Sequence, residues 1–355
     1  MRERDRGSEP DPGEALWFQK DGARPKIRRR EIHMADGKVL IPQNVAREGK
    51  NYLQQRGYEI KMGSGLTNDD IARDVADCDA ILARTAAFPA KVLEAGKRLK
   101  VIARHGVGFD NIDVPRATEL GIWVTFTPEA LTNTVAEYTI GCIIALARNF
   151  IRFDRELRTG NWEIRDRMTG IDLAGKILGV VGLGRIGRRV AKKAALGLEM
   201  QVIGYDPFLK PEQFDELAIP AKTWEEIFTA SDFVTFHMPG TEATKDIVGK
   251  KELEKMKKTA YLINAARGSV VNESDLIEAL RNGTIAGAAL DVYRKEPPET
   301  DNPLFAMSNV LLTPHNASLT GECMERLALH AAQGIDEVLS GRQPTWPVNK
   351  PIRRK

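Results

Sequence analysis

A glycine-rich string, GLGRIG at residues 182–187, follows the apolar run KILGVV and precedes the helical pattern RRVAKKAAL. A loop of this kind between a strand and a helix is typical of dinucleotide binding. Gly182 would allow the tight turn, Gly184 would let the backbone approach a pyrophosphate, and Gly187 would let the helix pack close to the sheet. Because free N–H groups at the helix start would hold the phosphates, this context favours a nucleotide site over an ordinary turn.

Asp206 ends the next strand candidate, QVIGYD. A carboxylate at this place accepts hydrogen bonds from the adenosine ribose and repels a 2′-phosphate. Pro207 and Phe208 follow, so no adjacent arginine is available for such a phosphate. The sequence therefore predicts NAD, rather than NADP, as the cofactor.

His315 lies in LLTPHNAS, directly after a proline and at the end of an apolar run. Two interpretations are open: a histidine in a capped loop, or an acid–base catalyst held in a fixed direction. An imidazole has an unperturbed pKa of about 6.5, so modest tuning lets it give and take a proton near neutral pH. The surrounding elements must decide between the two.

Short apolar runs alternate with helical patterns from Lys38 onward. Five strand candidates come first: KVLIP, YEIKMG, AILART, LKVIARH and IWVTF. Residues 132–162 then read as one long helix, a plausible bridge between domains. Six more strand candidates follow, KILGVVG, QVIGYDP, DFVTFHMP, TAYLINAARG, IAGAALDVY and NVLLTPH, before a closing amphipathic helix at GECMERLALHAAQGIDEVLSG. Continuous apolar strands separated by helices predict an α/β protein with two doubly wound, Rossmann-like parallel sheets.

Composition supports a globular protein of two ordinary domains: 355 residues, 42% hydrophobic and 28% charged. The net charge of +3 makes no electrostatic case for nucleic acid or a membrane surface, and no apolar run approaches a membrane span. Cys78, Cys142 and Cys323 lie far apart without ligand spacing, so we expect no metal site or disulfide, and a cytoplasmic location. The first 33 residues lack apolar periodicity, and folded pattern first appears from Met34, a candidate natural start. We therefore expect residues 1–36 to be a disordered extension or a start-site artefact.

Several motifs in order, GLGRIG…YDP, DFVTFHMPGTEAT, INAARGSVV, GAALDVYRKEPP and TPHNAS, resemble the D-isomer-specific 2-hydroxyacid dehydrogenases. The resemblance runs from Lys38 to Asn349 and is greatest to the D-3-phosphoglycerate dehydrogenases and their hydroxypyruvate-reducing relatives. It implies a substrate domain of residues 37–130 and 319–347, an NAD-binding domain of residues 131–318, and an active site in the cleft between them. It also implies a homodimer built on the cofactor domain.

The resemblance implies particular site residues. Arg267, Glu296 and His315 would be catalytic, and the loop Gly106, Val107 and Gly108 would receive the substrate carboxylate. Cofactor contacts would come from residues in the loops after strands: Val107, Arg185, Ile186, Asp206, Met238, Ala265, Ala266, Arg267 and Asp291. His105 lies beside the substrate loop and could contact substrate, but from its position we expect it to shape the loop. We expect His237 to be structural and His330 to be exposed or partly packed on the closing helix.

The catalytic three also make chemical sense without the resemblance. Reducing a 2-keto acid requires a hydride donor, a cation for the carboxylate and a proton donor for the alkoxide. The planar fork of Arg267 can grip a carboxylate bidentately. Glu296 can hydrogen-bond one ring nitrogen of His315, which fixes the tautomer and favours the imidazolium. Each residue alone could be an exposed polar group, but all three follow strands of a dinucleotide-binding unit, where such folds place their ligands.

The substrate is less defined by the sequence. Arg84 and Arg104 resemble phosphate-facing positions of phosphoglycerate dehydrogenases, although they could equally be rim arginines paired with surface acids. His105 and the motif TPHNAS depart from the common pattern of those enzymes. The sequence ends at Lys355 without a serine-sensing regulatory domain, so we expect no feedback control by that route.

Two alternatives to a phosphoglycerate dehydrogenase remain open. One is a hydroxypyruvate or glyoxylate reductase, or another D-2-hydroxyacid dehydrogenase. The other belongs to a different class, an NAD(H)-sensing binding protein such as a transcriptional corepressor, which shares this fold. Because such corepressors can keep the catalytic residues, His315 does not separate them from enzymes, whereas turnover would.

Overall fold

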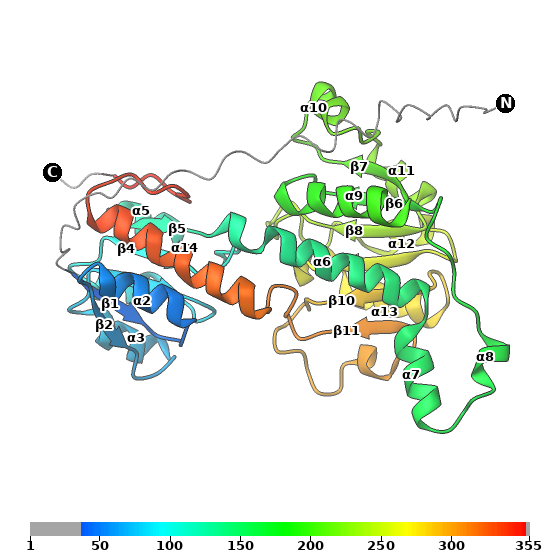
Figure 1. Ribbon diagram of the computed structural model, residues 1–355, viewed down its shortest axis with the longest axis horizontal. Helices are drawn as coiled ribbons and strands as arrows, with labels where there is room; N and C mark the ends of the chain where they lie inside the picture. The colour runs from blue at the N-terminus through cyan, green and yellow to red at the C-terminus, as the bar shows by residue number, and fades with distance from the viewer. Residues whose placement is uncertain (1–36, 353–355) are drawn as a thin grey trace, which may run out of the picture. The chain divides into compact units, whose positions relative to one another are not determined.

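The computed structural model describes residues 37–352 (Figure 1). The expected disordered extension, residues 1–36, lies outside the described residues. Two parallel sheets form the frame, as the alternation of apolar runs predicts. The fold is therefore α/β with two Rossmann-like units.

The first sheet has five parallel strands in the order β2-β1-β3-β4-β5. Each falls within a predicted apolar run: β1 (Lys38–Ile41), β2 (Glu59–Met62), β3 (Ala80–Ala83), β4 (Val101–Arg104) and β5 (Trp123–Thr125). Successive side chains of a strand point to opposite faces. One face of this sheet packs on α3 (Asn68–Val75), α4 (Ala90–Ala95) and α5 (Val114–Glu119), and the other packs on α2 (Arg47–Gln55) and α14 (Gly321–Leu339).

The closing helix α14 returns to this first sheet through small and apolar side chains, including Ala328, Ala331 and Ile335. Asp336 of α14 is buried and accepts hydrogen bonds from the hydroxyl groups of Tyr52 and Tyr58. Its carboxylate also pairs with two arginines, Arg56 and Arg342. A buried charge is tolerated only when it is paired in this way, so the cluster pins α14 against α2.

The second sheet has six parallel strands in the order β11-β10-β9-β8-β6-β7. They occupy the six predicted runs: β6 (Ile177–Val181), β7 (Gln201–Tyr205), β8 (Phe233–Phe236), β9 (Tyr261–Asn264), β10 (Gly287–Leu290) and β11 (Val310–Leu312). β6 pairs with β7 on one side and β8 on the other, so the chain reverses its direction across the sheet at β6. Ligands of doubly wound sheets bind at the carboxyl ends of strands at such a point.

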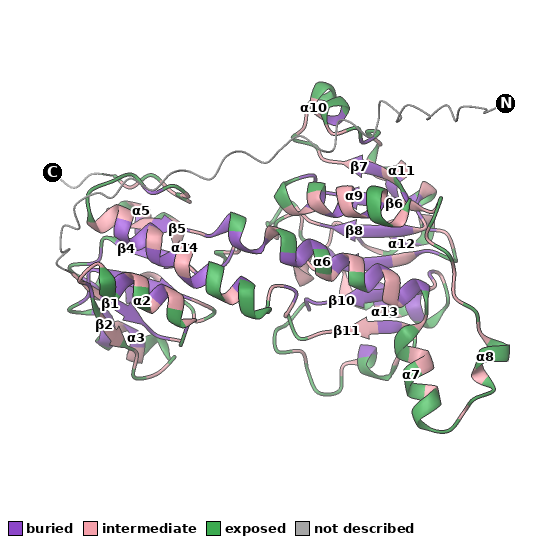
Figure 2. Ribbon diagram, in the orientation of Figure 1, coloured by how far each residue is buried: buried purple, intermediate pink, exposed green. Residues whose placement is uncertain are grey.

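Helices cover both faces of the second sheet, and its strands are largely buried (Figure 2). One core lies between the sheet and α6 (Pro128–Ala147), α9 (Arg185–Leu198) and α10 (Pro211–Glu216). The other lies against α11 (Trp224–Ala230), α12 (Lys250–Lys255) and α13 (Glu273–Arg281). These two cores hold the strand ends, and hence the loops after them, in fixed places.

The prediction of one helix over residues 132–162 is wrong. The structure has α6, then α7 (Phe150–Arg158) and the short α8 (Ile164–Arg167). Asn149 separates α6 from α7 with a left-handed backbone, φ 50°, a conformation that asparagine adopts more readily than most residues. Its side-chain amide donates to Thr169 O and the N–H of Ile171 donates to Ala147 O, so the returning chain stabilises the break.

Helix α6 is the most apolar long helix among the described residues. It has 20 residues with a mean hydropathy of 1.3 over its most apolar window, and by length and composition it could cross a membrane. More than half of that window, 56%, is buried inside the protein. Its buried residues, among them Cys142 and Ile143, pack on the second sheet, which is the role of a core helix.

Candidate active site

His315 and Glu296 lie within hydrogen-bonding distance of each other, 2.7 Å between Nδ1 and Oε2. His315 follows β11 and Glu296 follows β10, and these strands are neighbours in the sheet. A carboxylate beside Nδ1 accepts a hydrogen bond from the Nδ1–H group. This leaves Nε2 free to exchange a proton with a substrate. The structure thus joins two residues that the sequence places 19 positions apart.

The loop that carries His315 is anchored on Asp291. This carboxylate is buried and accepts hydrogen bonds from the hydroxyl of Thr313 and from the N–H groups of Asn316 and Ala317. The N–H of His315 donates to the backbone oxygen of Asp291 at 2.8 Å. His315 itself has a left-handed backbone, φ 50°, which is uncommon for a residue with a Cβ. The anchoring bonds therefore decide where its ring points.

The electrostatics of the pair follow from this contact. The hydrogen bond to Glu296 raises the pKa of His315 above its usual value, although partial burial acts in the opposite direction. For Glu296, burial acts to raise the pKa, but the hydrogen bonds from His315 and from the N–H of Tyr293 outweigh it and lower the pKa overall. Glu296 thus stays a carboxylate, and it stabilises the protonated ring.

Arg267 follows β9, the next strand in the sheet, and lies close enough to influence the pKa of both Glu296 and His315. Its Nε donates to Asp110 Oδ2 at 3.0 Å, and its Nη1 donates to the backbone oxygen of Ala266 at 2.7 Å. The amide of buried Asn264 binds both ends of this turn, donating to Arg267 O and accepting from the N–H of Ala266. The three predicted catalytic residues therefore gather at the ends of adjacent strands.

The predicted substrate loop follows β4. Gly106 has φ 149° and its N–H donates to the hydroxyl of Thr127. Arg104 is tied to backbone oxygens of the same loop, Nε to Gly108 and Nη1 to His105, both at 2.6 Å. Burial, and then the charge of Arg267, lower the pKa of Arg104 to about 10. The guanidinium of Arg104 is thus held in place beside the substrate loop and near Arg267.

Arg84 is less integrated into this group. Its Nη1 donates to the backbone oxygen of Asn44, while its charge helps to lower the pKa of Arg104 and His105. His105 is buried, and burial lowers its pKa to about 4. The imidazole of His105 is therefore uncharged at neutral pH.

The glycine loop has the backbone that dinucleotide binding requires. Gly182 has φ 89°, and a Cβ there would meet the backbone of His237 at 2.9 Å. A Cβ on Gly187 would lie 2.0 Å from Gly182 O, whereas one on Gly184 would meet nothing within 4 Å. Gly184 is the N-cap of α9, so open space faces the first N–H groups of that helix. These residues fit a pyrophosphate.

Asp206 holds the same loop from the next strand. Its Oδ2 accepts from the N–H of Leu183 and its Oδ1 from the N–H of Phe208, at 2.9 and 3.0 Å. The side chain of Phe208 is 90% exposed beside it. A carboxylate placed here fits the hydroxyl groups of a ribose better than a 2′-phosphate.

Because Gly184 faces open space with an ordinary φ of −69°, Gly184→Ala should fold normally. The added methyl would stand where the pyrophosphate approaches, so we expect the Kd for NADH to rise roughly tenfold. Fluorescence titration and the melting temperature check this together. Gly187→Ala is the contrasting variant, because its methyl would strike backbone and lower the melting temperature as well.

The remaining predicted cofactor residues, apart from Arg185, divide into two groups. Val107, Ile186 and Ala265 pack around one small core between α6 and α14. Met238 and Ala266 are partly buried against the core under α11 to α13. Arg185 is the exposed first residue of α9. The structure thus brings Val107, Ile186 and Ala265 together, whereas Met238 packs against a different core.

Other candidates have structural roles or lie elsewhere. His237 is partly buried beside the hydroxyl of Thr235, and desolvation lowers its pKa to about 3. His330 stacks on Trp346. All three cysteines are buried free thiols. Within residues 37–352, no group of His, Cys, Asp or Glu side chains could hold a metal ion.

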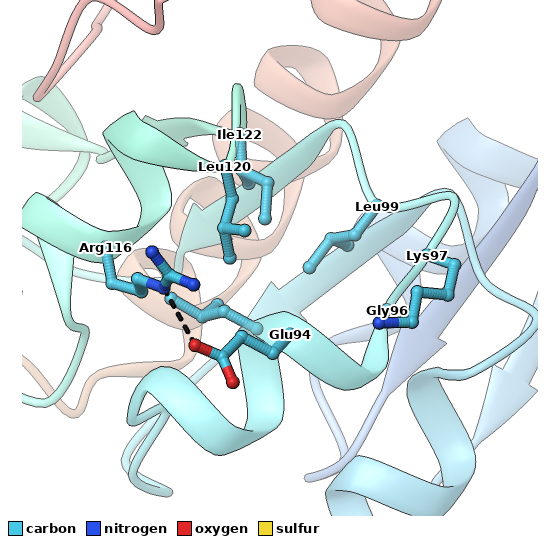
Figure 3. A pocket seen from close by; sticks show the side chains of 8 residues that line it. Glu94, Gly96, Lys97, Leu99, Arg116, Leu120 and Ile122 are labelled. Carbon is cyan, nitrogen blue, oxygen red and sulfur yellow. Dashed lines mark hydrogen bonds and ion pairs between the residues drawn. The ribbon is translucent and has the colours of Figure 1, made fainter. Parts of the chain in front are cut away.

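A cavity of about 270 Å³ lies on the first unit, between α4 and α5 (Figure 3). Its walls are apolar except for Glu94, Lys97 and Arg116, and Glu94 pairs with Arg116 at 2.8 Å. None of the predicted site residues lines this cavity. It has no part in the arrangement around His315.

Sequence reasoning missed residues that hold the site residues in place. Asp110 pairs with Arg267, Asn264 shapes its turn, and Tyr138 hydrogen-bonds the hydroxyl of Thr313 in the His315 loop. Asn264 could have been identified from the sequence, because it is the one polar residue besides Tyr261 in the otherwise apolar strand YLIN. Asp110 lies 157 positions from Arg267 and has no such signal in the sequence.

Comparison with known proteins identifies relatives of this chain. The family model "D-isomer specific 2-hydroxyacid dehydrogenase, NAD binding domain" matches residues 140–317. A glyoxylate reductase from Thermofilum pendens is 42% identical over 340 residues, covering 93% of this chain and 96% of that protein. The crystal structure of the TT0316 protein from Thermus thermophilus is 35% identical with a TM-score of 0.82, over 88% of this chain and 100% of that one.

A D-3-phosphoglycerate dehydrogenase from Archaeoglobus fulgidus is 39% identical over 315 residues. The match covers 88% of this chain but 59% of that relative, so this chain spans about three fifths of its length. The family match, the likeness to relatives over their full length and the Arg267–Glu296–His315 geometry point the same way. The chain belongs to the D-isomer-specific 2-hydroxyacid dehydrogenases, a family of NAD-dependent oxidoreductases, and it carries the NAD-binding domain of that family.

Proposed function

We propose that this chain interconverts a D-2-hydroxy acid and its 2-keto acid by hydride transfer, with NAD as the cofactor and His315 as the acid–base residue. The observation that carries the proposal is the Nδ1–Oε2 contact between His315 and Glu296 at 2.7 Å, beside the cation Arg267. In this arrangement His315 supplies a proton and Arg267 binds the substrate carboxylate, both from loops at the ends of adjacent strands. The bound nicotinamide supplies the hydride.

In the reducing direction, Arg267 would bind the substrate carboxylate, and Nε2 of His315 would hold the proton that the developing alkoxide takes. Glu296 keeps the Nδ1 proton in place and stabilises the charged ring. In the oxidising direction, neutral His315 would take the hydroxyl proton at Nε2. Asp291 holds the loop so that the ring does not turn away.

The raised pKa of His315 predicts a directional pH dependence. Reduction requires the protonated ring, so its kcat/KM should be constant at low pH and fall as pH rises through a midpoint above the ordinary histidine value of about 6.5. Oxidation requires the neutral ring and should rise through the same midpoint. Glu296→Gln removes the main cause of the shift and should move both midpoints to lower pH. A midpoint that stays in place in this variant would contradict the role of Glu296.

For the substrate we propose D-3-phosphoglycerate first. Arg104 lies near both Arg267 and Arg84, whose charges help to lower its pKa, and neither Arg104 nor Arg84 is ion-paired with an acid among the residues that the structure describes. A phosphate is bound best by two or more cations. The relative from Archaeoglobus fulgidus is a D-3-phosphoglycerate dehydrogenase by name, which supports the same choice.

A glyoxylate or hydroxypyruvate reductase is the second candidate. The glyoxylate reductase from Thermofilum pendens matches this chain over 96% of its own length, unlike the much longer phosphoglycerate enzyme. NADH oxidation against phosphohydroxypyruvate, hydroxypyruvate, glyoxylate and pyruvate separates the two. Turnover highest for the phosphorylated acid and reduced in Arg84→Ala supports the first candidate; a preference for an unphosphorylated acid that Arg84→Ala leaves unchanged supports the second.

We extend the proposal to a cytoplasmic homodimer without nucleic-acid or membrane partners. The large side chains Phe150, Ile151 and Leu157 of α7, and Trp162 after it, are each more than half exposed, and exposed apolar surface of this kind favours a protein partner. The low net charge of +3 gives no attraction to nucleic acid. Three buried free thiols are compatible with a reducing compartment.

A further inference from the structure

The guanidinium of Arg267 has five N–H donors. Asp110 Oδ2 accepts from Nε and lies 3.0 Å from Nη2, and Ala266 O accepts from Nη1. The two hydrogen bonds use the N–H of Nε and one N–H of Nη1, and Nη2 faces Asp110 as an ion pair. At least one N–H on each terminal nitrogen therefore has no hydrogen bond to these groups. A substrate carboxylate needs two donors of this kind for a bidentate bond. The protein contacts therefore fix one side of the fork and leave the other side for a ligand.

Two glycines define the path of this side chain. A Cβ on Gly108 would lie 1.7 Å from Nη2, and a Cβ on Gly240 would lie 3.0 Å from Cγ of Arg267. The aliphatic part of the Arg267 side chain therefore packs against the backbone of Gly240, and its guanidinium packs against the backbone of Gly108. Glycine contacts permit this path but do not pull the head into it, so a directed bond is needed at the end of the side chain. Ala266 O accepts one such bond from Nη1 within the same turn, and Asp110 accepts the other from Nε across 157 positions of sequence.

The repulsion between two neighbouring arginines also requires that the guanidinium of Arg267 be held in place. Arg267 and Arg104 are close enough for each positive charge to disfavour the other, while Asp110 favours the charged form of Arg104. Arg104 is held by the oxygens of Gly108 and His105, whereas the head of Arg267 could swing away from it. The carboxylate of Asp110 opposes that movement, because it attracts both guanidinium groups.

We propose that Asp110 is a positioning residue that orients Arg267 for the substrate carboxylate; this rests on the proposed function. Asp110 has a second, opposite effect, because its negative charge repels the anionic substrate. Its side chain is 60% exposed and that of Arg267 is 31% exposed, so solvent screens the repulsion. Solvent does not weaken the orienting effect of the Asp110 hydrogen bond on the long Arg267 side chain in the same way. We therefore expect the orienting effect to be larger than the repulsion.

The test uses Asp110→Asn and Asp110→Ala in the full chain, with Glu216→Gln, an exposed acid at the end of α10, as the matched loss of one charge. The readouts are the KM of the preferred 2-keto acid and the dissociation constant of oxalate, an unreactive carboxylate, from the NADH complex. We expect both to rise about fivefold in the alanine variant and less in asparagine, which keeps one acceptor oxygen. kcat, NADH affinity and melting temperature should stay constant.

Lower values in both Asp110 variants would show that the carboxylate competes with substrate, and unchanged values would show a surface pair without function; each result overturns the inference. Arg267→Lys separates this from a failure of the proposed function. If oxalate binds the lysine variant as tightly as the native chain, Arg267 is not the carboxylate anchor, and the proposed function of Arg267 and the role of Asp110 fall together.

Discussion

Replacing His315 by glutamine should lower the kcat of reduction by about 10²- to 10⁴-fold, the range that general acid catalysis contributes. The glutamine amide can still contact Glu296, but it cannot give a proton to the developing alkoxide. The N–H of residue 315 remains free to donate to Asp291 O, so the loop keeps its anchor. Steady-state rates at saturating NADH check the effect, and fluorescence titration should show an unchanged NADH affinity.

His315→Asn is the matched control for this change. His315 has φ 50°, and asparagine adopts this backbone more readily than glutamine. If the loss came from strain in the loop, asparagine would recover much of the activity. Because the loss is assigned to the missing proton, both variants should be equally slow. Near-native turnover in either would contradict the role of His315.

Replacing Arg267 by lysine should lower kcat/KM for every 2-keto acid by about 10- to 100-fold, the value of one or two hydrogen bonds to a charged group. Lysine keeps the positive charge but has a single nitrogen, so it cannot serve Asp110, Ala266 O and a substrate carboxylate together. Steady-state kinetics across the four acids check the result. An effect restricted to one acid would contradict a common carboxylate anchor.

Gly108→Ala offers a second way to disturb the same contact. Its Cβ would lie 1.7 Å from Nη2 of Arg267, which displaces the guanidinium without changing any charge. We expect a loss of kcat/KM similar to that of the lysine variant. If Gly108→Ala is silent, the observed position of Arg267 is not the one that binds substrate.

The eleven strands were predictable from the sequence because they are short runs between helical patterns, most of them apolar; β2, EIKM, is an exception with two charged residues. AILA of β3 and FVTF of β8 are buried throughout, as strands covered on both faces must be. The glycine loop was predictable for a different reason, because the local backbone conformation and close packing of the loop require glycine at these positions. The gathering of Arg267, Glu296 and His315 followed from parallel strands that end at one edge.

Tertiary contacts that leave no local pattern could not be predicted. The break at Asn149 interrupts a helical periodicity that continues on both sides, and it is stabilised by a segment 20 residues later. Asp110 and Arg267 are separated by 157 positions, and nothing in GVGFDNID marks one aspartate as the partner. Asp291 was predicted as a cofactor contact, but its bonds to the His315 loop require the folded chain.

The most direct test of His315 as the acid–base residue is NAD reduction with the D and L forms of the same 2-hydroxy acid, for the native chain and His315→Gln. We expect the native chain to oxidise the D form only, and the glutamine variant to lose that activity while it still binds NAD. Equal rates in the variant, or oxidation of the L form, would contradict the assigned site. Tight NAD binding without turnover of either form would identify a nucleotide-sensing protein instead of an enzyme.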